Sequence, residues 1–103
     1  MKINGKEIEF DATDSIQIAK MEEALENMGS KEAEIKSLDA KLSVQLVRLV
    51  GVLSDFFKEA TGEDILEGVT SYEKAQQFYF DFLNEIGKQK SKVLAAYNPN
   101  RVR

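Results

Sequence analysis

The sequence predicts a mainly α-helical, three-helix domain built on a long central helix at about residues 31–60, with an N-terminal β-hairpin docked on it. Two observations predict this fold. Apolar residues recur at spacings of three and four from Ile35 to Ala60, which is the α-helical period. The first ten residues instead alternate around Asn4-Gly5, a dipeptide typical of two-residue hairpin turns. A chain of 103 residues has room for these elements in one domain.

The hairpin is expected to have an apolar side, formed by Ile3, Ile8 and Phe10. Two strands alone are only marginally stable in water, so this side should pack on the helices. Pairing of a free hairpin edge with a strand of another chain is the less favoured alternative.

A first helix is expected to begin after Thr13 or Asp14, either of which can cap it, and to run to about Met28. Gly29-Ser30 is the predicted stop. The apolar stripe of this helix is Ile18, Met21, Leu25 and Met28. Methionines at this spacing fill a core in the simpler interpretation, and form an adaptable binding surface in the other.

The central helix has two apolar sides and therefore needs two neighbours. The second side is narrow and consists of Val44, Val47 and Gly51. The main side, predicted to be buried, comprises Ile35, Leu38, Leu42, Leu46, Leu49, Val50, Leu53, Phe56, Phe57 and Ala60.

A last helix is predicted from a capping box, with Thr70 as cap and Glu73 reaching back, to around Ala96. Its aromatic stripe should pack on the leucines of the central helix. Phe80 lies outside this stripe, so it should contact the hairpin or be exposed as part of a protein-binding surface. The predicted single domain therefore spans residues 1–97, and residues 98–103 form a short basic C-terminal tail.

The composition argues against an enzyme. The chain has no cysteine and no histidine, which removes the commonest nucleophile, acid–base and metal side chains. Acidic residues between Gly62 and Gly68 lack the spacing of a calcium loop. No catalytic residue, cofactor or metal site is predicted.

Charge and hydropathy narrow the class of partner. The net charge is −4, and five cations in residues 88–103 leave −9 for residues 1–87. An acidic body argues against a nucleic-acid binder. The longest apolar run is far shorter than the roughly 20 residues of a membrane span, and the start lacks the apolar core of a signal peptide, so a cytoplasmic protein is expected.

Four segments carry a resemblance to a known group of proteins. They are the opening MKINGKEIEF, the passage from Asp55-Phe56-Phe57 to Gly62-Glu63-Asp64, the aromatic helix after Ser71, and the ending Tyr97-Asn98-Pro99-Asn100-Arg101. In layout the chain resembles small proteins encoded in the tail modules of siphophages and prophages of Gram-positive bacteria, and these resemble tail assembly chaperones.

The resemblance implies a non-enzymatic role in the bacterial host cytoplasm. Such a protein would bind the long helical tape measure protein, keep it soluble and help tail tube subunits assemble around it. A structural tail component, such as a connector or completion protein, and a helical interaction module of another system are the alternatives. Homo-oligomer formation is left open.

The candidate partner-binding surface combines spare apolar side chains with basic residues. An amphipathic helix would be held along i, i+3, i+4 and i+7 anchors, which suits such a surface. The residues predicted for it are Met21, Met28, Val44, Val47, Phe80, Lys90, Lys92 and Arg101.

Overall fold

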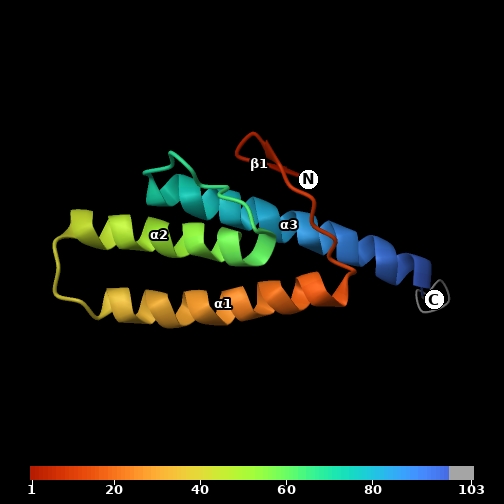
Figure 1. The fold of residues 1–103 in the computed structure, drawn as a ribbon, viewed down its shortest axis with the longest axis horizontal. Coiled ribbons are helices and arrows are strands. Elements are labelled where there is room, and N and C mark those ends of the chain that lie inside the picture. Colours follow the sequence, from red (N-terminus) through yellow and green to blue (C-terminus); the bar gives the residue numbers. More distant parts are fainter. Residues whose placement is uncertain (98–103) are drawn as a thin grey trace.

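The computed structural model describes the backbone of residues 1–97 and the side chains of residues 1–92, so the predicted basic tail lies outside this part. Its elements are β1 (Lys2–Ile3), β2 (Lys6–Glu7), α1 (Ser15–Lys36), α2 (Leu42–Thr61) and α3 (Tyr72–Tyr97). The predicted class, three helices with an N-terminal hairpin packed on them, is confirmed. Helices α1 and α2 run antiparallel, and α2 lies between α1 and α3 (Figure 1).

The hairpin has the predicted turn and the predicted buried side. Asn4 and Gly5 both have positive φ, 52° and 72°, and Ile3 pairs with Lys6. The Asn4 amide nitrogen Nδ2 donates to the Ile65 carbonyl oxygen at 2.8 Å, which ties the turn to the connector between α2 and α3. Ile3, Ile8 and Phe10 are all buried.

The predicted central helix is interrupted, so its start is wrong. Residues 31–36 belong to α1, residues 37–41 form a turn, and the helix resumes at Leu42. The Ser37 hydroxyl donates to the Glu34 carbonyl at 2.8 Å, and the Gln45 side chain donates to the Leu38 carbonyl at 3.0 Å. The first bond satisfies a backbone oxygen that the end of α1 leaves free, and the second ties the turn to α2. The turn folds the chain back, so that Ile35 is buried at the interface of α1 with α2.

The predicted stop at Gly29-Ser30 is also wrong, because α1 continues through both residues to Lys36. A glycine inside a helix costs only about 1 kcal/mol relative to alanine, which packing of the helix can offset. The predicted cap of α1 and the expected end of the central helix near residue 60 are confirmed. Asp14 caps α1 by accepting from the Gln17 backbone N–H at 3.2 Å, and Gly62 ends α2 with φ of 79°.

The cap of α3 is one residue later than predicted. Ser71, not Thr70, accepts a hydrogen bond from the backbone N–H of Lys74, at 3.3 Å from the hydroxyl oxygen. Because α3 begins at Tyr72, the Thr70 hydroxyl lies one residue too early to reach the first free amides.

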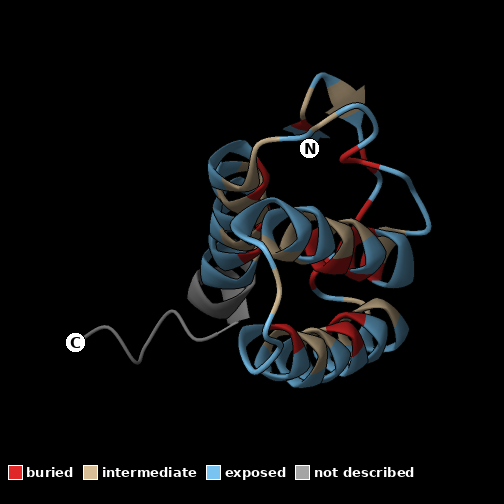
Figure 2. Ribbon diagram, turned by 90° about the vertical axis from the view of Figure 1, so that its left-hand side faces the viewer, coloured by how far each residue is buried: buried red, intermediate tan, exposed pale blue. Residues whose placement is uncertain are grey.

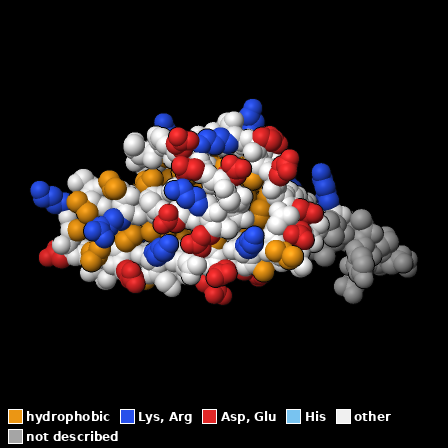
Figure 3. All heavy atoms as spheres, in the orientation of Figure 1, with side chains coloured by type: hydrophobic (Ala, Val, Ile, Leu, Met, Phe, Trp, Pro, Cys, Tyr) orange, Lys and Arg blue, Asp and Glu red, His pale blue; other side chains and the backbone are white. Residues whose placement is uncertain are grey.

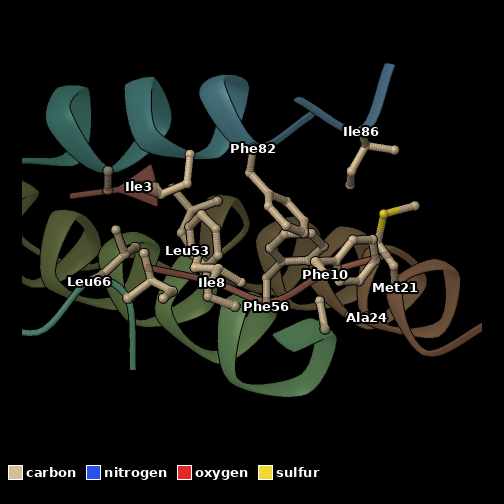
Figure 4. Packing of buried hydrophobic residues seen from close by; sticks show 14 of the residues in the cluster. Ile3, Ile8, Phe10, Met21, Ala24, Leu53, Phe56, Leu66, Phe82 and Ile86 are labelled. Atoms are coloured by element: carbon tan, nitrogen blue, oxygen red, sulfur yellow. The ribbon is translucent and has the colours of Figure 1, made fainter. Parts of the chain in front are cut away.

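Aromatic side chains from three segments form the centre of the core (Figure 4). The buried residues lie on the sides of the helices that face the other elements (Figure 2). The Phe82 ring of α3 lies 5.9 Å from Phe56 and 5.4 Å from Phe57, centroid to centroid, in edge-to-face arrangements. The Phe10 ring packs on Phe82 from the other side at 5.2 Å. The aromatic stripe of the last helix therefore packs on α2 as predicted, and the segment after the hairpin completes the cluster.

The first turns of α2 are not covered. Leu38, Leu42 and Leu46 were expected in the buried stripe, and all three are exposed; Leu42 retains 69% of its accessible surface. The reason is the placement of α3. It begins beside a later part of α2, so it does not cover the first turns of α2 (Figure 1).

Candidate functional site

Exposed apolar side chains gather where α1 passes into α2. Five of the seven large hydrophobic residues that are exposed in the described part of the chain lie between residues 38 and 47. We call this surface the apolar end; it consists of Leu38, Leu42, Val44, Leu46 and Val47. It forms one end of the molecule, where hydrophobic side chains are interspersed with basic ones (Figure 3).

Helical geometry gives the apolar end a leucine side. Leu42, Leu46 and Leu53 follow one another at spacings of four and seven, so they share one face of α2. Leu53 is buried between α1 and α3, whereas Leu42 and Leu46 continue the same face beyond the start of α3. The leucine side is thus an uncovered extension of the core.

The valine side faces away from the core. Val44 is nine residues from Leu53, which places it about 180° around the helix. Together with Ser43 and Arg48, Val44 and Val47 line a shallow hollow of about 250 Å³. Val47 is 73% exposed, the highest value among the large hydrophobic residues.

A groove between α1 and α3 lies on the other side of α2. It has a volume of about 290 Å³ and Leu53 contributes to its lining from α2. Burial, and secondarily the charge of Glu32, raises the pKa of both Tyr72 and Tyr79. The remaining lining residues are Met28, Lys36, Gln76 and Phe80.

The structure separates the residues predicted for partner binding. Met28 and Phe80, which is 55% exposed, meet at the groove between α1 and α3. Val44 and Val47 meet on the opposite side of α2. Met21 lies in the core with 5% of its surface exposed, beside Ile86 and Phe10 (Figure 4).

The predicted basic residues lie away from these apolar groups. Lys90 and Lys92 are both exposed, near the far end of α3. Arg101 is outside the described residues. A single surface that joins these lysines to the valines of α2 is therefore not formed within residues 1–92.

Leu38, Leu42 and Leu46 were missed as site residues because their spacing matched the buried stripe. The available signal was the amount of apolar surface on residues 31–60, which have a long apolar stripe from Ile35 to Ala60 and a second, shorter strip at residues 44–51. Sequence spacing does not reveal where along a helix its neighbour begins, and that position decides which leucines are covered.

A larger hollow, of about 650 Å³, lies between the end of α2, α1 and the segment after the hairpin. Charges of both signs line it, including Lys20, Glu23, Lys58 and Glu59. Within residues 1–92 no group of three or more Asp, Glu, His or Cys side chains is placed to hold a metal ion. No helix in the described part is long and apolar enough to cross a membrane.

Comparison with known proteins gives one finding. A family model described as a family of unknown function, DUF6673, matches residues 4–103. No match is found among curated proteins or among solved structures.

Proposed function

We propose that this chain, which belongs to the DUF6673 family of unknown function, is a non-enzymatic phage tail assembly chaperone that binds the helical tape measure protein. The observation that carries the proposal is the apolar end, where five large hydrophobic side chains are exposed on one small domain. The resemblance of the sequence to proteins of phage tail modules supports the choice of partner.

The apolar end suits an amphipathic helix as its ligand. Burying a leucine or valine side chain that was exposed stabilises a complex by about 1.5–3 kcal/mol before the costs of association. Leu42, Leu46 and Leu49 follow the spacing with which one helix packs along another. A few such contacts give binding that excludes water from an apolar stripe.

This binding would serve tail assembly in the host cytoplasm. A tape measure protein presents long apolar stripes before the tube surrounds it, and such stripes associate with one another in water. The chaperone covers one stripe through its apolar end and is displaced when tail tube subunits bind. The small size of the surface favours release, because few side chains have to separate.

The proposal is tested by co-expressing the chain with fragments of the tape measure protein, followed by affinity capture and a measurement of fragment solubility. Capture should be lost in Leu42→Asp and in Val47→Asp. A matched control is Ile16→Asp, because Ile16 is 66% exposed at the start of α1 and lies far from the apolar end. Circular dichroism should show that all three variants remain helical.

Two results would contradict the proposal. If no fragment is captured by the folded wild-type chain, the tape measure protein is not its partner. If the chain is present in stoichiometric amounts in purified virions, as mass spectrometry would show, it is a structural tail component and not a chaperone that leaves.

A further inference from the structure

The apolar end is a basic region on an acidic molecule. Residues 36–50 contain Lys36, Asp39, Lys41 and Arg48, a net charge of +2. The whole chain carries −4, and its tail arginines contribute +2, so residues 1–92 carry −6 and their part outside 36–50 carries −8. The segment that carries the exposed apolar side chains is therefore basic, whereas the rest of residues 1–92 is acidic.

The three cations border the apolar end on different sides. Arg48 lines the hollow of the valine side together with Val44 and Val47. Lys36 lines the groove that the leucine side extends, and Lys41 is exposed at the turn, immediately before the first residue of α2. Charges on both flanks of an apolar stripe are the arrangement that selects the orientation and register of a bound helix.

These cations have no partner of their own within the described residues. Lys6, Lys31 and Lys88 each form a salt bridge with a carboxylate, whereas Lys36, Lys41 and Arg48 form none. Glu34 and Arg48 line a separate hollow between α1 and α2, and Glu32 lines the groove with Lys36, but neither pair forms a salt bridge. In addition, the first turn of α2 contains no acidic residue and no side chain caps it, although a helix start favours negative charge.

From this charge arrangement we infer that the apolar end recognises an amphipathic helix of another protein whose apolar stripe is bordered by Asp and Glu. The inference rests on the proposed function and adds the chemistry by which the partner segment is selected. A second copy of this chain is disfavoured as the occupant, because two basic ends would face each other in a two-fold dimer.

The test uses three synthetic helical peptides that share one leucine stripe and carry Glu, Gln or Lys beside it. Their affinity for the full chain is measured by fluorescence anisotropy at low and at high salt. The Glu peptide should bind about tenfold more tightly than the Lys peptide at low salt, with the Gln peptide between them. Higher salt should reduce the difference.

Charge reversal identifies the residues responsible. The double variant Lys41→Glu with Arg48→Glu should reverse the order of the peptides. The matched control is Lys90→Glu with Lys92→Glu, which makes the same change in net charge near the far end of α3 and should keep the wild-type order.

Three outcomes would overturn the inference. Equal binding of all three peptides, lost in Val47→Asp, would leave an apolar docking site without charge selection and would not affect the proposed function. Failure of all three peptides to bind would also overturn it, and capture of tape measure fragments would then decide the proposed function separately. A dimer in sedimentation experiments that Val47→Asp abolishes would identify a second copy as the occupant.

Discussion

At the scale of single residues, Gln89 joins the segment after the hairpin to α3. Its side-chain oxygen accepts from the Ala12 backbone N–H at 2.7 Å, and its amide donates to the Phe10 carbonyl at 3.0 Å. The partners of Gln89 are more than seventy positions away in the chain. Such a contact depends on tertiary structure and has no local sequence signal.

Gln89→Ala should lower the free energy of unfolding by about 1–3 kcal/mol, because two partly buried backbone groups lose their partners. Urea denaturation measures this change. Gln77→Ala is the control, since Gln77 is exposed on the same helix, and it should stay within about 0.5 kcal/mol of the wild type. Equal free energies of unfolding for the two variants would show that the Gln89 hydrogen bonds do not contribute to stability.

The raised pKa values of Tyr72 and Tyr79 predict that the protein loses stability at high pH. Burial, and then Glu32, raises the pKa of both phenols above 10.0, the value they have when unfolded. The folded state therefore holds protons that the unfolded state releases, so the unfolding free energy should fall as the pH rises past about 10. Denaturation measured at a series of alkaline pH values checks this direction.

Glu32→Gln should move the pKa of both phenols part of the way back, because burial is the larger cause and remains. Spectrophotometric titration in a Tyr97→Phe background isolates these two tyrosines. Titration curves that coincide with and without Glu32 would exclude a carboxylate near the phenols.

At the scale of the elements, local chemistry predicted the hairpin turn, the start of α1 and the end of α2. Asn4-Gly5 has the residue types that a tight hairpin turn requires, and Asp14 is a helix-capping residue; both were placed correctly. The helix α2 ends at Thr61, close to the expected residue 60. The turn at residues 37–41 was missed because it contains no glycine or proline, and Leu38 and Leu42 keep the helical spacing across it. Periodicity alone does not distinguish a continuous helix from two helices joined in register.

A substitution at Gly29 tests whether α1 continues past Gly29-Ser30, as the structure shows. In α1, Gly29 is a helix interior position, and an added Cβ would meet no other atom within 4 Å. Gly29→Ala should therefore stabilise the fold by about 0.5–1 kcal/mol in urea denaturation. A destabilisation would instead support a helix end at Gly29-Ser30, where alanine is unfavourable. Gly62→Ala is the contrasting variant, because φ of 79° at Gly62 makes alanine costly.

At the scale of the whole molecule, the packing of the three helices leaves part of the apolar surface of α2 exposed. The second apolar strip of residues 31–60 predicted that Val44 and Val47 would need a neighbour, and the fold supplies none. Leu42 and Leu46 became part of the same surface only through the placement of α3. The valine half of the candidate site was thus predictable from the sequence. The exposure of its leucine half could be known only from the packing of the whole domain.

Hydrogen–deuterium exchange on the purified complex tests whether the apolar end is the surface that binds the tape measure protein. Exchange of backbone amides in the chain alone is compared with exchange in the complex with a captured tape measure fragment. If the apolar end is this surface, residues 38–50 should gain protection in the complex, and residues 15–24 at the start of α1 should exchange as in the free chain. Protection confined to the hairpin or to α1, with residues 38–50 exchanging as in the free chain, would show that the apolar end is not the binding surface.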